Sequence, residues 1–289
     1  MDYFGGIRRD NRFSPNHTGN DIAIFELTAQ CLKERGFGVN EYSEEECINK
    51  GIAENHIFSM AREPLVAKVL QEKENRGAVS VNSGYGVENC YRSNMVRLLL
   101  QAKLPIPATV IVDSRHFSPD CFKAVGEADF WIKRGDFHAI HKEDVSFVHC
   151  VNEGREMISE YAHRDINEVV ICKHIAGDLV KFYGVRNTGF FYWFYPVEAN
   201  HSKFGNESVN GAVQHVPFQL EMLQFAAAQS ATALNIDVYG GDAVISPEGH
   251  ICLIDVNDWP SFAPCRKEAA IAIADCIIKK SFGKSEKSE

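Results

Sequence analysis

Three oxygen-bearing side chains near the end of the sequence have the types and the spacing that suit a bound cation. They are Asp242, Asp255 and Asn257, in the segment GGDAVISPEGHICLIDVN at 240–257. The flanking stretches AVIS and HICLIDVN have strand composition, and Pro-Glu-Gly at 247–249 is typical of a turn between strands. The segment therefore predicts a β-hairpin with an acid on each strand.

The register of this hairpin decides what the acids can do. If the turn is centred on its Glu-Gly pair, Asp242 lies opposite Asp255 with Cβ atoms about 5 Å apart, and Asn257 points to the same face. Opposed carboxylates repel one another unless a cation or proton lies between them. Three oxygen ligands suit Mg²⁺ that bridges to phosphates. The alternative is a loop in which Asp255 and Asp258 are solvated acids.

The elements that must position these residues change in character along the chain. Up to about residue 110, strand and helix patterns alternate, from YFGGI at 3–7 through DIAIFELTAQCLKERG at 21–36, which favours a small parallel sheet. From about residue 130 short strand patterns dominate. They are interrupted by the helix pattern EGREMISEYAHR at 153–164 and followed by a long helix at 217–235. We therefore expect an α/β unit followed by antiparallel α+β units.

The amino-acid composition bears on which partners the protein can bind and in which compartment it is found. The 289 residues are 45% hydrophobic and 24% charged, which is ordinary for a globular protein. The net charge of −9 argues against a nucleic-acid surface, and the longest apolar runs, such as 190–196, are too short to span a membrane. Nine scattered cysteines without a CxxC pair, and no apparent signal peptide, predict reduced thiols in a cytoplasmic protein.

Several motifs occur in an order known from one superfamily. A strand ends in Asn-Ser at 82–83, a helix and strand follow in ENCYRSNMVRLLLQAKLPIPATVIV at 88–112, and WIKRGD contains Lys133. EVVICKHIAGD, LVKFYGV and finally IDVN come next. In this order the sequence resembles the ATP-grasp superfamily, particularly its RimK-like branch, over most of the chain.

The resemblance implies an α/β and α+β architecture. An N-terminal pre-ATP-grasp α/β domain at 1–110 would precede two α+β lobes that enclose ATP. The central lobe, or lid, would cover 111–175, and the C-terminal lobe with the metal site 176–282. Residues 283–289 are predicted to be a disordered tail.

The resemblance also implies nucleotide-binding roles. It places Lys133 on the α- and β-phosphates and Arg92 where relatives have another phosphate-binding lysine; the alternative for each is a solvent-facing surface residue. Backbone groups of 172–175 would bind adenine, and Asp178 is the acid nearest the expected ribose position. The complete predicted ATP-binding set is Arg92, Lys133, Cys172, Lys173, His174, Ile175, Asp178 and Ile254.

The acceptor side departs from the family pattern. The segment after the strand lysine has Gly135 alone where relatives carry several glycines, so His138 is a candidate to cover the phosphates. Lys181 and Arg186 are the predicted catalytic cations, and Asp242, Asp255 and Asn257 the predicted ligands of Mg²⁺, with Mn²⁺ as the alternative ion. An N-terminal basic loop either binds the substrate anion or is a solvated turn; its residues are Arg8, Arg9, Arg12 and His17.

The resemblance implies an ATP-dependent ligase that joins a carboxylate to an amine through an acylphosphate. The substrate would be a small molecule or peptide with a carboxylate. The alternative is an inositol phosphate-like polyol kinase of the same fold, which shares the Asp-x-Asn pattern of IDVN and the lysine of LVKFYGV. A nucleotide-binding regulator without turnover is a third hypothesis. The sequence leaves a homodimer open.

Overall fold

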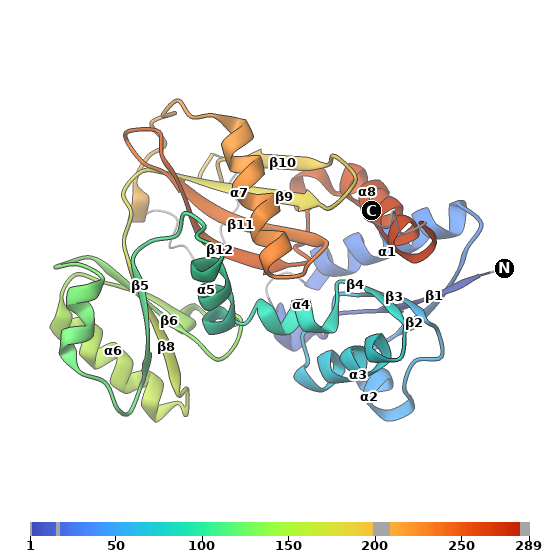
Figure 1. Cartoon of the computed structure of the whole chain (residues 1–289), viewed down its shortest axis with the longest axis horizontal. Helices are drawn as coiled ribbons and strands as arrows, with labels where there is room; N and C mark the ends of the chain where they lie inside the picture. The colour runs from blue at the N-terminus through green and yellow to red at the C-terminus, as the bar shows by residue number, and fades with distance from the viewer. Residues whose placement is uncertain (1, 16–17, 199–208, 284–289) are drawn as a thin grey trace, which may run out of the picture.

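The computed structural model describes residues 2–15, 18–198 and 209–283, and within them three four-stranded sheets carry the architecture (Figure 1). One sheet is parallel and belongs to the N-terminal part. The other two are antiparallel and form the central and C-terminal lobes. The predicted combination of α/β and α+β units is therefore confirmed.

The N-terminal sheet has the strand order β2-β1-β3-β4. The alternation of strands and helices predicted this sheet, but not β3 or α2, because four and seven residues are too few to show a period. The strands are β1 (Tyr3–Ile7), β2 (Gly38–Tyr42), β3 (His56–Ser59) and β4 (Val79–Val81), with the helices α1 (Thr18–Glu34), α2 (Glu44–Lys50) and α3 (Pro64–Asn75).

The last helix of the chain completes the core of the first domain. Helix α8 (Arg266–Phe282) packs against α1, and Figure 1 shows the two side by side. Ile273 and Ile277 of α8 belong to the same buried cluster as Phe4 and Ile24. The predicted N-terminal domain at 1–110 is therefore closed by residues from the opposite end of the chain.

The central lobe is a sheet of order β5-β8-β6-β7 covered by one helix. Strand β5 begins at Thr109 and pairs with β8, so the predicted boundary after residue 110 falls inside a strand. Phe130 and Ile132 pack with α6, while the residues between and after them face the other way. The elements are β5 (Thr109–Asp113), β6 (Phe130–Arg134), β7 (Val145–Val148), α6 (Val151–His163) and β8 (Glu168–Lys173).

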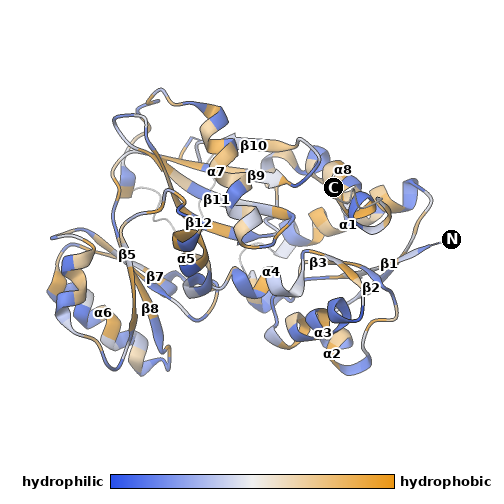
Figure 2. Ribbon diagram, viewed as in Figure 1, coloured by the Kyte–Doolittle hydropathy of each residue, from blue (hydrophilic) through white to orange (hydrophobic). Residues whose placement is uncertain are grey.

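The C-terminal lobe is a sheet of order β10-β9-β11-β12 with α7 on one face. In Figure 2 the helices carry alternating hydrophobic and hydrophilic segments, as expected of helices with one buried side. The elements are β9 (Asp178–Val185), β10 (Phe191–Phe194), α7 (Leu220–Ala233), β11 (Val238–Ile245) and β12 (Ile251–Asp258).

Two helices and several short 3-10 turns connect these parts. Helix α5 follows α4 and packs on both the central lobe and α7. The buried side chain of Asn82, just before α4, bonds the backbone of Asp237 and Val238 and ties the parallel sheet to β11. The remaining elements are α4 (Gly84–Asn89), α5 (Arg92–Gln101) and 3-10 turns at Asn11–Phe13, Pro119–Ala124, Lys142–Asp144 and Ala263–Cys265.

Two properties of the described chain bear on its environment. No helix there is both long enough and apolar enough to cross a membrane. All nine cysteines are free thiols, as the sequence predicted. The predicted tail lies outside the described residues, apart from Gly283.

Candidate active site

A cavity of about 250 Å³ receives side chains from both antiparallel sheets and from loops and helices of the N-terminal part. Strands β6 and β8 of the central lobe line one part, β9, β11 and β12 of the C-terminal lobe another, and the loop after β1 a third. Because the predicted nucleotide and metal residues come from these same strands, their positions can be compared one by one.

The β11–β12 hairpin has the predicted register at the two acids. Asp242 pairs directly with Asp255, and Asn257 lies opposite Gly240. A β-bulge follows between Asp242 and Ala243, so the register changes only on the turn side. A Cβ atom on Gly241 would lie 2.4 Å from the backbone oxygen of Asp255. The glycine before Asp242 therefore allows the two strands to approach at this point.

Each acid of the hairpin is paired with a base from another element. Lys181 of β9 is the neighbour of Asp242 in the sheet, and its Nζ lies 2.6 Å from Asp242 Oδ1. Arg92, at the start of α5, reaches Asp255 Oδ1 at 3.1 Å. Burial alone raises the pKa of Asp255, but the positive charges of Arg92 and Lys133 outweigh it and hold that pKa below its ordinary value. Asp255 is therefore ionised at neutral pH.

Lys133 enters the same region from the central lobe. The side chain is buried, and its Nζ donates to the carbonyl oxygen of Ile254 at 3.2 Å. Trp131, two residues earlier on β6, lines the cavity on the same face. Ion-paired and cavity-facing residues of this region are called the cavity cluster below: Arg92, Lys133, Lys181, Asp242, Asp255 and Asn257.

The predicted adenine hinge lines the cavity. Cys172, Lys173, His174 and Ile175 all belong to its wall, as does Ile254. The amides of Lys173 and His174 already donate to the carbonyls of residues 108 and 129, so these two N–H groups are engaged.

Residues that the sequence did not single out complete the hinge region. Trp131 Nε1 donates to His174 Nδ1 at 3.1 Å, and burial lowers the pKa of His174, which favours its neutral form. Asn210 donates to the carbonyls of Ile175 and Gly177 at 3.0 and 3.1 Å. Trp131 could have been found from its spacing to Lys133, whereas nothing local marks Asn210.

Two predicted site residues do not face the cavity. Asp178 is buried, and its carboxylate accepts from the amides of Gln214 and Val216 at 2.7 and 2.8 Å, which fixes that loop instead of binding ribose. Arg186 pairs with Asp237 at 3.6 Å outside the cavity. Their tertiary partners, in place of positions on the cavity wall, do not support the predicted roles of these two side chains.

In the N-terminal basic loop, some of the predicted residues line the cavity and others do not. Arg8 is paired with Glu41 and Arg12 with Glu63, both in partly exposed positions away from the cavity wall. Arg9 does line the cavity and is buried against Asp21, with 3.2 Å between Nη1 and Oδ2. The predicted substrate role of Arg8 and Arg12 is therefore not supported, and His17 lies outside the described residues.

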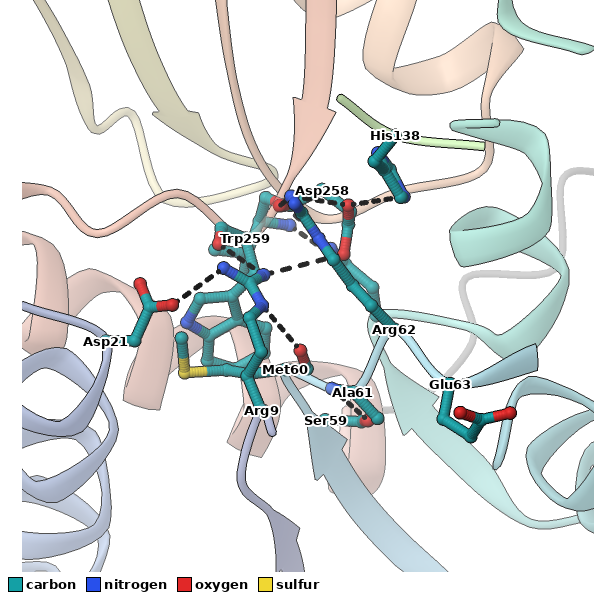
Figure 3. Close-up of polar contacts among 12 residues, drawn as sticks. Arg9, Asp21, Ser59, Met60, Ala61, Arg62, Glu63, His138, Asp258 and Trp259 are labelled. Carbon is teal, nitrogen blue, oxygen red and sulfur yellow. Dashed lines mark hydrogen bonds and ion pairs between the residues drawn. The ribbon is translucent and has the colours of Figure 1, made fainter. Parts of the chain in front are cut away.

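A second group of charges meets where the loop after β1, the segment after β3 and the end of β12 come together (Figure 3), and its members Arg9, Asp21 and Arg62 also line the cavity. Asp258 is fully buried at the end of β12, with Arg62 Nη2 and His138 Nε2 at 3.2 and 3.4 Å from its Oδ1. Arg9 Nη2 lies 3.8 Å from its Oδ2 and donates to the carbonyl of Trp259 at 2.9 Å. Burial lowers the pKa of Arg62, and Asp258 opposes this. The interdomain cluster comprises Arg9, Asp21, Arg62, His138 and Asp258.

His138 belongs to the interdomain cluster and not to the phosphate region, where the sequence predicted it to lie. Its side chain is 3% exposed and is directed to Asp258, so it joins the loop after β6 to β12. It does not belong to the cavity wall, whereas the next residue, Ala139, does. Asp144 holds the same loop by accepting from the amides of Ile140 and His141 at 2.9 and 3.0 Å.

The acids and the amide of the hairpin fit a divalent ion that shares its coordination with phosphate. Asn257 Nδ2 lies 3.3 Å from Asp255 Oδ2, so these side chains meet. Within the described part of the chain, no group of three or more His, Cys, Asp or Glu could hold a metal by itself. Two carboxylates and an amide leave coordination positions for phosphate oxygens, as Mg²⁺ requires in nucleotide sites.

Solved structures with the same fold match over nearly the whole chain. D-alanine–D-alanine ligase from Bacillus anthracis complexed with ATP gives a TM-score of 0.68 at 14% identity, with 97% of each chain covered. A RimK domain ATP-grasp protein from Sphaerobacter thermophilus gives 0.64 at 15% identity, covering 95% of this chain and 99% of that one. The ATP-grasp ligase PsnB, complexed with minimal precursor, gives 0.61 at 14% identity, covering 97% and 100%.

The sequence by itself finds no such relatives, since no family model matches it and no curated protein does. The class is defined by the arrangement of a parallel N-terminal sheet followed by two antiparallel sheets with a cavity between them. The chain has the ATP-grasp fold, of the kind seen in D-alanine–D-alanine ligases and RimK domain proteins. The predicted fold is thereby confirmed.

Proposed function

We propose that this protein is an ATP- and Mg²⁺-dependent ligase that joins a carboxylate to an amine through an acylphosphate. The observation that carries the proposal is the cavity cluster. The opposed acids Asp242 and Asp255 are ion-paired with Lys181 and Arg92, and Lys133 and the hinge residues 172–175 line the same cavity. In an ATP-grasp fold this arrangement suits a nucleotide with its phosphates on the bases and its purine at the hinge.

The chain's own residues account for binding and orientation. Lys133 and Arg92 would hold phosphate oxygens, since both are buried at the cavity and both carry cationic donor groups. Trp131, Cys172 and Ile254 offer an apolar wall for the purine. When bound to Asp242, Asp255 and Asn257, Mg²⁺ would neutralise charge on the β- and γ-phosphates. Mn²⁺ would serve in the same place.

The acceptor side is assigned to the N-terminal domain. Arg9 and Arg62 line the cavity there, and Ser14 and Ser261 also belong to its wall. Lys181 is the cation paired with Asp242 in the metal region, and it is the one we assign to the reacting phosphoryl group. Closure by the loop after β6 would keep water from the acylphosphate.

The candidate carboxylates follow from the similar structures. The named relatives include a D-alanine–D-alanine ligase and PsnB with its precursor, so amino acids and short peptides are the first acids to test. A cytoplasmic location belongs to the same proposal, because the nine free thiols suit a reducing compartment.

The kinase alternative shares Lys181 and the Asp-x-Asn pattern of Asp255 and Asn257. A polyol polyphosphate needs a dense group of accessible cations, however, and Arg8 and Arg12 are paired with glutamates outside the cavity. This pairing supports the ligase over the kinase.

The test is a hydroxylamine trap. The protein is incubated with ATP, Mg²⁺, hydroxylamine and a panel of amino acids and short peptides, and hydroxamate and ADP are measured. Hydroxamate formation that requires one of the acids supports the ligase. Phosphate transfer to a polyol without hydroxamate would support the kinase instead. Nucleotide binding without ADP release for any acceptor would support the regulator.

A further inference from the structure

The two acids of the candidate metal site are both engaged by bases in the protein alone. Lys181 Nζ lies 2.6 Å from Asp242, and Arg92 Nη1 lies 3.1 Å from Asp255. The first pair joins neighbouring strands, and the second joins a helix to a strand. A cation that approaches these carboxylates therefore meets a positive charge already bound to each.

The net charge of the cavity cluster also opposes the binding of a divalent ion alone. Arg92, Lys133 and Lys181 carry three positive charges, while Asp242 and Asp255 carry two negative ones. A divalent ion alone would add to the positive excess within a few ångströms, where like charges are strongly unfavourable. A triphosphate that arrives with the ion reverses the excess. The cluster is thus matched to an ion and a triphosphate together.

The bases have donors available for such a triphosphate. Arg92 Nε is buried and makes no hydrogen bond within the described residues, although the side chain is 6% exposed and lines the cavity. Lys133 Nζ donates to one backbone carbonyl and has two further protons. Lys181 has a flexible stem and three protons, so its ammonium can move from Asp242 to a phosphate oxygen.

We propose that Lys181 and Arg92 act as exchangeable counter-ions, which hold the metal carboxylates until the triphosphate takes both bases. This proposal rests on the proposed function, because it concerns the same nucleotide site. It gives Lys181 a second role, since besides binding phosphate this side chain keeps the site from taking up a divalent ion alone. The ion and the nucleotide then bind together. The ion takes the place of the bases beside the carboxylates, and the triphosphate takes the place of the carboxylates beside the bases.

The experiment measures metal binding without turnover. Mn²⁺ is titrated into the wild-type protein and into Lys181→Met, and free Mn²⁺ is followed by electron paramagnetic resonance. Removing the ammonium beside Asp242 is expected to tighten binding of Mn²⁺ alone by about tenfold or more. The same change is expected to weaken binding of a non-hydrolysable ATP analogue by about tenfold. Asp242→Asn in the Lys181→Met background should abolish the gain for Mn²⁺.

The matched control is Lys280→Met. Lys280 makes an ion pair of the same length, 2.6 Å, with Asp237, but lies outside the cavity wall. This variant should leave both affinities unchanged. Thermal melting of each variant verifies that it is folded.

Two different failures can be told apart. If the wild-type protein binds the ATP analogue but Lys181→Met does not tighten Mn²⁺ binding, the counter-ion exchange is wrong and the proposed function stands. If the wild type binds no ATP analogue in the presence or absence of metal, the proposed function itself is wrong. Tight binding of Mn²⁺ alone by the wild type, equal to that of Lys181→Met, would also overturn the exchange.

Discussion

The cavity cluster and the interdomain cluster use the same strand in opposite ways. Asp255 and Asn257 of β12 face the cavity, while Asp258, the next residue, points to the other face and is fully buried. Around Asp255 the bases outnumber the acids and keep donors available. Around Asp258 two arginines are matched by two aspartates, Asp21 and Asp258. One strand end therefore carries a candidate binding site and a structural joint.

The charge balance differs between the two clusters because they have different roles. A buried charge must be balanced, and balance from within the protein indicates structure. Balance that is incomplete beside a cavity indicates a ligand. Substitutions of the two β12 acids should therefore differ in their main effect, which is on ligand chemistry for Asp255 and on stability for Asp258.

Asp255→Asn should have the largest effect on chemistry. It removes a carboxylate from the ion, and loss of that charge stabilisation should reduce ATP-dependent product formation by about a thousandfold or more. The variant should remain folded, because asparagine keeps the shape of the side chain and one oxygen acceptor for Arg92. Turnover in the hydroxylamine assay and a thermal melt measure the two quantities. Near wild-type turnover would remove Asp255 from the metal site.

Asp258→Ala should affect stability more than Asp255→Asn does. It leaves Arg62 and Arg9 buried without their shared partner, which is expected to lower the free energy of unfolding by about 3–5 kcal/mol. Urea unfolding measures the loss. Arg12→Ala, which breaks a partly exposed pair with Glu63, is the control and should cost about 1 kcal/mol or less. Equal stability of Asp258→Ala and wild type would contradict a structural role for the interdomain cluster.

Lys133→Met should weaken nucleotide binding by about tenfold to a hundredfold, because hydrogen bonds to a charged partner contribute about 1.5–3 kcal/mol. Calorimetric titration with a non-hydrolysable ATP analogue measures the change. Lys123→Met is the control: Lys123 is in the same lobe and exposed, and pairs with Asp120 on the surface. If Lys133→Met binds the analogue as tightly as Lys123→Met and the wild type do, Lys133 is not part of the phosphate site.

The smallest effect concerns acid sensitivity of the loop that positions His138. Burial raises the pKa of Asp144, but hydrogen bonds from the amides of His141 and Ile140 and from Arg164 outweigh it, so the pKa is lowered. Because the folded-state pKa is below the unfolded value of about 3.9, Asp144 stabilises the fold above that pH. The stabilisation is lost as pH falls through the folded-state pKa.

Asp144→Asn tests this. The wild-type free energy of unfolding should fall more steeply than that of the variant below about pH 4. Urea unfolding at a series of pH values measures both slopes. Parallel pH profiles would show that Asp144 makes no such contribution.

What the sequence could predict was local. The hairpin and the pairing of Asp242 with Asp255 were predicted from the segment 240–257, but the observed pairing also depends on the β-bulge between Asp242 and Ala243, which was not predicted from the sequence. Lys133 stands out because a lysine in an apolar strand needs an anion. The ATP-grasp resemblance depends on the order of such local motifs, and the fold bears it out.

What the sequence could not predict depends on partners far along the chain. Arg62 contacts Asp258 across 196 positions, and no pattern around Arg62 announces it. Arg186 and Asp178 were themselves predicted site residues, but the partners that the structure gives them come from other segments. The role of a side chain that depends on tertiary contacts therefore cannot be predicted from hydrophobic periodicity or from local motifs.

The packing of α8 on α1 has a consequence for how the protein can be divided. The hydrophobic interior of the first domain includes Ile273 and Ile277, which follow both antiparallel lobes in the sequence. A fragment that ends near residue 110 would expose the apolar side of α1 and should be aggregation-prone. Adding a separate peptide that covers 266–282 should restore its solubility. The two antiparallel lobes are therefore inserted into a domain whose core is completed by a helix that follows both of them in the sequence.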